Sequence, residues 1–431
     1  MRCFTLSIIF TVASLIAGVW GYKVLPAQYD GSMSLYDFST VEGKPEIPDS
    51  LSPVYVSYVG RHGSRYLSSE KKVSAIEKVL LRSKTRKHIT PDGMKFLRLL
   101  SEVRKKTDSR WGALDSIGVN EQCRLAREMY GMWPEIFRAG RIDARATYVP
   151  RVVMSMYMFT HTLSELSDSL EIYTDEGRQN DALLRFFDTD TAYVDYLDNG
   201  AWREAYDEFM SRHTPVEPAL RLVGRNSGLS YDELRKLTMD MYGVLQGLRA
   251  SGMQPPTTEW MSVSEYKACR EVSNLKHYLQ RVDNRYSDIA ARAASPLLAE
   301  IVSNADVAIE AILSEKQPAG DKSSLRRADL FFGHAETLMP LLSRMGLPGC
   351  SPCYENCFRT LSVSPDFANL TTLWDVTEVS PLAANLELVF MVSPSDRIYV
   401  LIRLNGRNLE LTDGDGYITP WQSLKQSWNL Q

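Results

Sequence analysis

The sequence lacks the features that define several large protein classes. Its 431 residues contain no internal repeat and no low-complexity tract, and the formal net charge of −4 leaves no overall basic excess. Such a charge gives no indication of a nucleic-acid partner, so any anion site must be a local basic pocket in an acidic protein. Length alone allows two or three domains, or one large α/β domain that carries an insertion.

Long apolar runs are also missing after the N-terminus. There, Arg2 precedes an apolar run from Phe4 to Val19 that contains small residues near its end. This pattern predicts a secretory signal peptide over residues 1–21, with an uncleaved membrane anchor as the alternative. We therefore expect an extracytoplasmic protein, periplasmic or secreted, with no stable membrane insertion once the signal is removed.

Cysteine is scarce, with six residues in the whole chain. Cys3 would leave with the signal peptide, and three of the others are crowded within residues 350–357. In an oxidising compartment this cluster favours one local disulfide and leaves at least one thiol over. A zinc site is the alternative, but no fourth ligand is evident nearby. The pairing stays open among the five cysteines of the mature chain, which are Cys123, Cys269, Cys350, Cys353 and Cys357.

Two kinds of segment alternate along the chain. Apolar runs that predict strands occur at residues 54–58, 328–332, 386–392 and 398–404, whereas the stretch from about 175 to 320 carries polar-amphipathic helical patterns. We expect an α/β fold with a central, mostly parallel sheet flanked by helices, and an inserted all-α cap domain. The predicted domains are the signal peptide at 1–21, a discontinuous core at 22–172 and 322–431, and the cap at 173–321.

The first of three turns that precede helices holds two arginines and a histidine. Arg61, His62 and Arg65 follow the predicted strand at 54–58. Cations and backbone N–H groups at such a turn can bind phosphate, and an imidazole there can act as a nucleophile. Taken alone, the same residues would equally fit a solvated basic turn.

Two further turns supply possible partners. Arg151 lies at the start of a helix, and His334 and Glu336 follow the strand predicted at 328–332. Because Pro340 would break a hydrogen bond in a helix interior, we expect this last helix to begin near Thr337, after both of these side chains. They would then face the carboxyl end of the sheet, where open α/β sheets bind ligands.

These residue types together suit the hydrolysis of phosphate monoesters, one of the slowest uncatalysed reactions. Arginines would stabilise the charge on the phosphoryl oxygens, a neutral imidazole would attack phosphorus and form a phosphohistidine, and a carboxylic acid would protonate the leaving alkoxide. We expect the arginines to lower the pKa of His62, and a raised pKa to keep Glu336 protonated. Activity should then be strongest on the acid side of neutrality.

The motifs also carry a specific resemblance to a known family. Arg-His-Gly-Ser-Arg at residues 61–65 resembles the signature of the histidine acid phosphatases, and His334-Ala335-Glu336 resembles the variant proton-donor motif of the multiple inositol polyphosphate phosphatases. Residues 146–155 and 114–118 are similar to further segments of that family, although Asp115 replaces the usual Thr. The resemblance extends from about residue 50 to the C-terminus and is weakest in the helical insertion.

The resemblance implies a role for each of these side chains. His62 would be the nucleophile and Glu336 the proton donor. The phosphoryl group would be bound by the other four, which are Arg61, Arg65, Arg151 and His334. The substrate would be a small phosphorylated molecule, myo-inositol hexakisphosphate (phytate) or a lower inositol polyphosphate, and neither a metal nor an organic cofactor is implied. The alternatives are a broad-specificity or sugar-phosphate acid phosphatase and, in another class, a non-catalytic receptor for a phosphorylated ligand.

Overall fold

The computed structural model describes residues 29–254, 257–314, 325–350, 373–411 and 416–429. The predicted signal peptide and two of the clustered cysteines, Cys353 and Cys357, lie outside these ranges. No disulfide joins Cys123, Cys269 and Cys350 to one another. Among the helices that the structure describes, none is long and apolar enough to cross a membrane.

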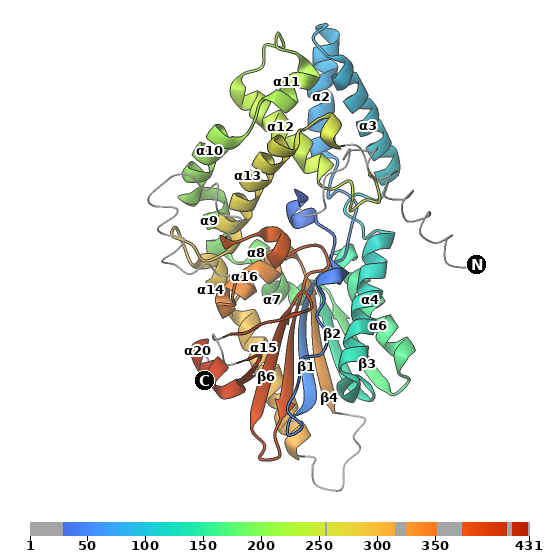
Figure 1. Ribbon diagram of the computed structural model, residues 1–431, viewed down its shortest axis with the longest axis vertical. Helices are drawn as coiled ribbons and strands as arrows, with labels where there is room; N and C mark the ends of the chain where they lie inside the picture. Colours follow the sequence, from blue (N-terminus) through green and yellow to red (C-terminus); the bar gives the residue numbers. More distant parts are fainter. Residues whose placement is uncertain (1–28, 255–256, 315–324, 351–372, 412–415, 430–431) are drawn as a thin grey trace, which may run out of the picture.

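A mixed sheet forms the centre of the molecule (Figure 1). Its strands lie in the order β3-β2-β4-β1-β5-β6-β7, and β8 pairs with β6. The first four strands in this order are parallel, whereas the remaining ones form an antiparallel extension. The strands are β1 (Ser52–Arg61), β2 (Gly140–Ala146), β3 (Leu170–Glu176), β4 (Arg326–Gly333), β5 (Asn385–Val392), β6 (Ile398–Leu404), β7 (Arg407–Asn408) and β8 (Ile418–Pro420). The predicted α/β fold is confirmed.

Helices cover both faces of this sheet, which explains the near-continuous apolar runs of its central strands. Along β1, Tyr55 and Val59 belong to one hydrophobic cluster, and Val56 and Tyr58 belong to the cluster on the opposite face. The helices of the first face are α15 (Ser295–Ser314), α16 (Ala335–Met345) and α20 (Trp421–Ser427). Those of the second are α4 (Ser116–Met132), α5 (Pro134–Phe137) and α6 (Pro150–Leu166).

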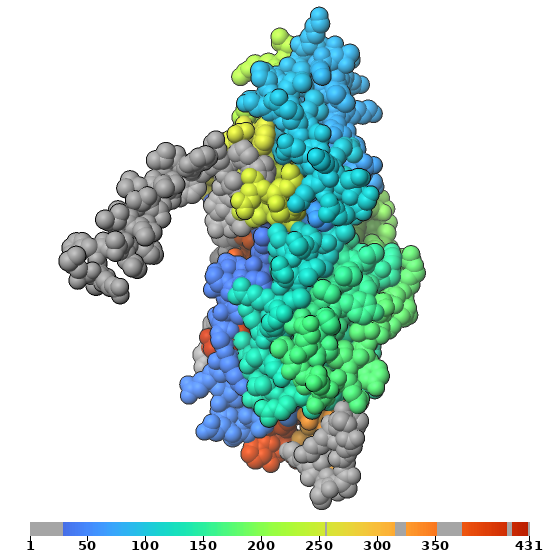
Figure 2. All heavy atoms as spheres, turned by 90° about the vertical axis from the view of Figure 1, so that its right-hand side faces the viewer, coloured from blue at the N-terminus to red at the C-terminus, as the bar shows by residue number. Residues whose placement is uncertain are grey.

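A helical layer lies beyond the carboxyl ends of the parallel strands, at the top of Figure 1. Figure 2 shows part of it in blue and yellow above α4 and α6. One hydrophobic cluster of this layer joins α2 (Lys71–Thr85) and α3 (Pro91–Thr107) to α11 (Glu217–Val223), α12 (Tyr231–Leu245) and α13 (Val263–Arg281). The layer therefore combines an early chain segment with the later one that the sequence pattern indicated.

The domain division at residues 173 and 321 stays a prediction. Packing crosses it, because β3 spans residue 173 and α15 lies against the sheet. The other α-helices are α7 (Asp181–Leu184), α8 (Phe186–Thr189), α9 (Thr191–Asn199), α10 (Trp202–His213), α14 (Ile289–Ala293) and α19 (Val376–Val379). Short 3-10 turns occur at Gly31–Met33, Phe38–Thr40, Arg178–Asn180 and Thr257–Glu259.

Candidate active site

The site begins at the carboxyl edge of three neighbouring parallel strands. β1 ends at Arg61, which pairs in register with Gly333 at the end of β4, and β2 ends at Ala146 on the other side of β4. The backbone N–H of His62 extends this ladder by donating to the carbonyl oxygen of Gly333 (3.1 Å). The three turns that carry the predicted residues therefore leave one edge of the sheet side by side.

One ring nitrogen of His62 is fixed by the backbone. Its Nδ1 lies 2.9 Å from the carbonyl oxygen of Gly63. A carbonyl oxygen can only accept a hydrogen bond, so the neutral ring carries its proton on Nδ1 and leaves Nε2 unprotonated. The residue is 3% exposed and lines a cavity. This geometry offers Nε2 as a nucleophilic atom.

The loop that follows β1 is held from behind by α4 and α6. The N–H of Ser64 donates to Oε2 of Glu121 (2.7 Å), and its hydroxyl donates to Asp115, the N-cap of α4 (3.1 Å). The N–H of Gly63 donates to the hydroxyl of Ser155 on α6 (3.1 Å). Burial raises the pKa of Glu121 to about 7. The backbone around the histidine is thus fixed by side chains from two different helices.

Three arginines act electrostatically on His62. Arg61 donates from Nη1 to the carbonyl oxygens of Ser32 (2.8 Å) and Ser380 (2.6 Å), which fixes its guanidinium. Burial and repulsion from Arg151 lower the pKa of Arg61 to about 10 and that of Arg65 to about 9. All these arginines remain cations at acidic and neutral pH, so the site concentrates positive charge for an anionic group.

The expected lowering of the His62 pKa is confirmed. Burial is its largest cause, followed by repulsion from Arg151, Arg61 and Arg65. Since both causes disfavour the imidazolium, the ring stays neutral well into the acid range. The arginines were the expected cause, but burial at the end of a central strand has the larger effect.

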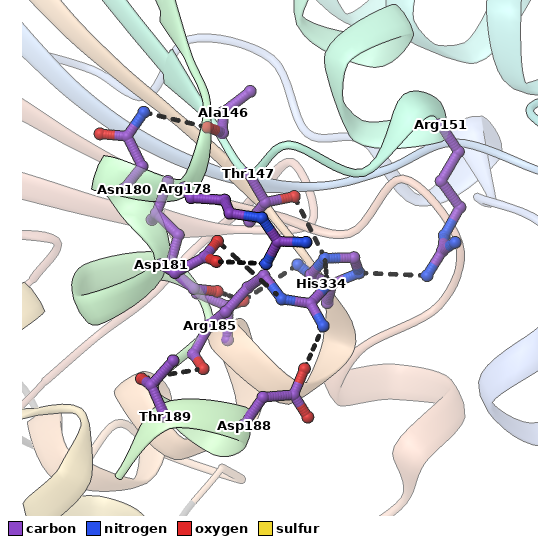
Figure 3. A network of polar contacts seen from close by, with 12 residues as sticks. Ala146, Thr147, Arg151, Arg178, Asn180, Asp181, Arg185, Asp188, Thr189 and His334 are labelled. Atoms are coloured by element: carbon purple, nitrogen blue, oxygen red, sulfur yellow. Dashed lines mark hydrogen bonds and ion pairs between the residues drawn. The ribbon is translucent and has the colours of Figure 1, made fainter.

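His334 lies between two arginines, as Figure 3 shows. Its Nδ1 is 3.4 Å from Nη2 of Arg151, and its Nε2 is 3.5 Å from Nη1 of Arg185. The hydroxyl of Thr147 is 3.2 Å from the same Nε2. Burial and the nearby Arg151 lower the pKa of His334 to about 3. A neutral imidazole ring therefore stands 5.7 Å from the ring of His62, edge to face.

The expected start of the last helix is wrong. α16 begins at Ala335, and His334 is its N-cap, with a backbone N–H that donates to the hydroxyl of Thr337 (3.0 Å). Thr337 is thus the third residue of the helix rather than the cap. Pro340 lies inside α16, where its missing N–H costs one hydrogen bond, to the carbonyl of Glu336. Glu336 therefore belongs to the first helical turn, not to the loop before it.

We also expected a raised pKa for Glu336, and this expectation is wrong for the protein without a bound ligand. Burial raises it, but the neighbouring Arg281, His334 and Arg61 together outweigh burial and lower the pKa to about 2. Oε1 of Glu336 lies 3.8 Å from Nη2 of Arg281, and its side chain is 35% exposed. The carboxyl group is therefore ionised across the acid range in which we expected it to be protonated.

A cavity of about 330 Å³ brings most of the predicted residues together. Its lining includes Arg61, His62, Arg65, Arg151 and Glu336. His334 contacts Arg151 beside the cavity.

The opposite wall of the cavity comes from the helical layer and was not predicted. Lys72 lies on α2, Gln246 directly follows α12, and His277 lies on α13. Arg185 and Arg281, which contact His334 and Glu336, were missed as well. None of these five residues belongs to a local sequence motif. They were missed because only the packing of the folded chain brings them to the site.

Comparison with known proteins gives a family match over most of the chain. The family model described as histidine phosphatase superfamily (branch 2) matches residues 54–404. The chain is 26% identical over 357 residues to chicken (Gallus gallus) multiple inositol polyphosphate phosphatase 1, covering 78% of this chain and 74% of the chicken protein. The human (Homo sapiens) protein of the same name is 27% identical over 169 residues, which are 39% of this chain and 33% of the human protein.

The fold also matches a solved structure. The multiple inositol polyphosphate phosphatase of Bifidobacterium longum, crystallised with inositol hexasulfate, superimposes with a TM-score of 0.76. The match covers 93% of this chain and 97% of that one, at 14% sequence identity. At that identity the superposition supports the fold, whereas the residues of the site rest on their own geometry.

Proposed function

Since the chain belongs to branch 2 of the histidine phosphatase superfamily, we propose that it hydrolyses phosphate monoesters through a phosphohistidine formed on His62. The observation that carries this proposal is the orientation of that ring. Its Nδ1 proton is directed at the carbonyl of Gly63, so Nε2 keeps its lone pair beside three arginines. A neutral, buried imidazole next to an anion site has both the electron pair and the positive surroundings that attack on phosphorus requires.

In the first step, Nε2 of His62 attacks phosphorus and the bond between phosphorus and the ester oxygen breaks. The electron pair of that bond goes to the leaving oxygen, which takes a proton from Glu336. Arg61, Arg65 and Arg151 stabilise the charge on the three equatorial oxygens. The ring becomes positively charged as it is phosphorylated, and the hydrogen bond from Nδ1 to Gly63 stabilises that charge.

Glu336 requires a proton before it can act as the acid. Its pKa of about 2 reflects positive neighbours, and the negative charge of a bound phosphoryl group would offset them and raise this pKa. Acidic conditions and a monoanionic ester both favour delivery of this proton. We therefore expect the highest activity on the acid side of neutrality.

In the second step, water attacks the phosphorus of the phosphohistidine. Glu336, now ionised, takes a proton from the water, and the bond between phosphorus and Nε2 breaks. The electron pair returns to His62, and inorganic phosphate leaves. The carboxylic acid is regenerated in this step and can protonate the next leaving group.

We propose phytate and lower inositol polyphosphates as the substrates. Two relatives carry the name multiple inositol polyphosphate phosphatase, and the His334-Ala335-Glu336 motif resembles the variant of that group. A polyanion also suits a cavity whose charged lining is mostly basic.

Phosphate release from phytate by the wild type and by His62→Ala tests the reaction. We expect steady release from the wild type and a rate at least about a thousandfold lower from the variant. His161→Ala is a matched control, because this histidine is 66% exposed on α6. Near-zero release from both proteins would contradict the proposed enzymatic activity and favour a non-catalytic receptor for a phosphorylated ligand. Ion-exchange chromatography of the products would report the substrate range.

We also propose that the protein is exported. The support is the charged and apolar pattern of residues 1–21, which lie outside the described part. Mass spectrometry of the purified mature protein checks this, since export with cleavage predicts a chain that begins near residue 22.

A further inference from the structure

The guanidinium group of Arg61 is oriented by two backbone carbonyl groups. Its Nη1 carries two hydrogens, which are donated to the carbonyl oxygens of Ser32 (2.8 Å) and Ser380 (2.6 Å). Its Nε is buried and has no hydrogen bond to any described residue. Because Nε and Nη2 form an edge that can bind two oxygens at once, this arrangement directs the remaining edge of the guanidinium to the phosphoryl group.

The two carbonyl groups differ in how the chain around them is supported. Ser380 is the C-cap of α19, whereas Ser32 lies in a three-residue 3-10 turn, Gly31–Met33, close to the N-terminus. Segments near a chain terminus are poorly ordered unless other contacts tie them down. The orientation of Arg61 therefore depends on whatever holds the N-terminal turn, residues 30–34, in place.

Asp30 ties the N-terminal turn to the helical layer. Its buried carboxylate accepts a hydrogen bond from Nε of Arg249, which follows α12 (2.8 Å), and one from the hydroxyl of Tyr266 on α13 (3.0 Å). Its carbonyl oxygen accepts the N–H of Met33 (3.0 Å) and so closes the turn around Ser32. The side chain and the main chain of Asp30 thus both act on the position of Ser32.

The N-terminal turn is also fastened at its other end. The N–H of Leu382 donates to the carbonyl oxygen of Ser34 (2.9 Å), and the N–H of Ser34 donates to that of Gly31 (3.0 Å). Gly31 has a φ of +56°, in the left-handed region that favours glycine. In Figure 1 this blue segment lies between the helical layer and the sheet. Ser32 is therefore held between two anchors, of which Asp30 is the one on the helical layer.

We propose that Asp30 is a positioning residue for the phosphatase reaction, which holds the carbonyl oxygen of Ser32 where it directs Arg61 to the phosphoryl group. This inference rests on the proposed function, in which Arg61 binds that group. Asp30 does not line the cavity, so it acts through Arg61 and not on the substrate. Loss of its side chain would release the turn from the helical layer and weaken one of the two contacts that orient Arg61.

The contact persists in the acid range in which we expect the highest activity. Burial raises the pKa of Asp30 to about 6, and the contacts with Arg249 and Tyr266 limit this rise. A protonated carboxyl group keeps an oxygen that accepts from Arg249, and its O–H group can donate to the hydroxyl of Tyr266. Asp30 therefore holds the turn both as a carboxylate and as a carboxylic acid.

The test measures kcat/KM for p-nitrophenyl phosphate and, by isothermal titration calorimetry, the affinity for inorganic phosphate. We expect both to fall at least about fivefold in Asp30→Ala and in Arg249→Ala. Asp30→Asn keeps an oxygen for Arg249 and an N–H group for Tyr266, so both values should stay within about threefold of the wild type.

Asp306→Ala is the matched control. This carboxylate on α15 also accepts from an aromatic residue and a cation, Trp421 (2.7 Å) and Lys425 (2.9 Å) on α20, but it does not contact the N-terminal turn. Both values should stay within about twofold of the wild type.

A double-mutant comparison separates positioning from a general loss of structure. If Asp30 acts through Arg61, adding Asp30→Ala to Arg61→Ala should lower kcat/KM by less than about twofold further. A further loss of at least about fivefold in that background overturns the inference. Values within about twofold of the wild type in both Asp30→Ala and Arg249→Ala overturn it as well. If Asp30→Ala does not fold, Arg249→Ala decides, because that side chain is 22% exposed.

Failure of this inference can be distinguished from failure of the proposed function. A wild type that hydrolyses p-nitrophenyl phosphate, with variants that behave like it, overturns the role of Asp30 only. A wild type that binds inorganic phosphate more tightly than Asp30→Ala does, but hydrolyses no ester, overturns the phosphatase reaction and supports the positioning of Arg61. A wild type that neither binds phosphate nor hydrolyses esters overturns both.

Discussion

Gly63 and Gly118 lie in direct backbone contact behind the proposed nucleophile. A Cβ at Gly63 would be 2.7 Å from the Cα of Gly118 and 2.6 Å from its carbonyl oxygen. A Cβ at Gly118 would be 2.2 Å from the carbonyl oxygen of Ser64. The loop that carries His62 therefore rests on the first turn of α4, and two residues without side chains permit this approach.

Gly118→Ala should destabilise the protein and reduce its activity together. The new methyl group meets backbone atoms that cannot rotate away, so we expect a loss of at least about 2 kcal/mol in the free energy of unfolding. Gly131→Ala is the matched control on the same helix, because a Cβ there meets nothing within 4 Å. It should be neutral or stabilising by up to about 1 kcal/mol. Urea denaturation measures both, and equal effects of the two substitutions would contradict the contact.

Glu121→Ala should weaken the same loop by a different route. Glu121 accepts the N–H of Ser64 (2.7 Å) and the N–H of Tyr36 (3.3 Å), and all three residues are buried. Removal of the carboxyl group leaves two buried donors unpaired, which costs about 1–3 kcal/mol for each. Urea denaturation at neutral pH provides the measurement. Glu102→Ala, at an exposed position on α3, is the control and should change stability by less than about 0.5 kcal/mol.

Glu336→Gln should slow the hydrolysis of esters with a weakly acidic leaving group more than that of esters with a strongly acidic one. An alkoxide from an inositol needs a proton as it leaves, whereas p-nitrophenolate needs little help. We expect kcat/KM for phytate to fall by about 10²–10⁴-fold. The rate constant of the pre-steady-state burst of p-nitrophenol should fall by less than about tenfold. Stopped-flow absorbance measures the burst, and equal losses on both substrates would argue against a role in leaving-group protonation.

The sequence predicted the parts of the site that depend on local pattern. Apolar runs located the strands that end at Arg61 and Gly333, and parallel strands necessarily bring their carboxyl ends to one edge. The residues that follow these strands were therefore recognisable without the structure. The start of α16 was missed because Thr337 can serve either as an N-cap or as the third residue of a helix, and only packing distinguishes them.

The opposite wall could not be predicted for a physical reason. Lys72, Gln246 and His277 reach the cavity only when helices distant in sequence pack together, and each looks like an ordinary surface or helical residue by itself. The same holds for the pKa of Glu336, which depends on Arg281 more than 50 positions earlier in the chain. The local motif identifies Glu336 as a candidate proton donor. Whether its carboxyl group is ionised depends on residues that are distant in the sequence and that packing brings next to it.

The stability of the protein should depend on pH through His277. Its folded-state pKa of about 3 lies below the ordinary value of 6.5, so between these values the unfolded state binds a proton that the folded state excludes. This histidine therefore lowers stability as the pH falls below 6.5, by about 1.4 kcal/mol for each pH unit. Other buried groups, among them Glu121 and Asp30 with raised pKa values, act in the opposite direction. Total stability alone would not isolate the effect.

His277→Asn removes the titrating group and leaves the others in place. The stability of the wild type relative to this variant should thus decrease by about 2 kcal/mol between about pH 6.5 and pH 5. Urea denaturation at both pH values measures the change. A relative stability that is constant with pH would show that His277 titrates normally in the folded protein, and that burial and its cationic neighbours do not control its charge.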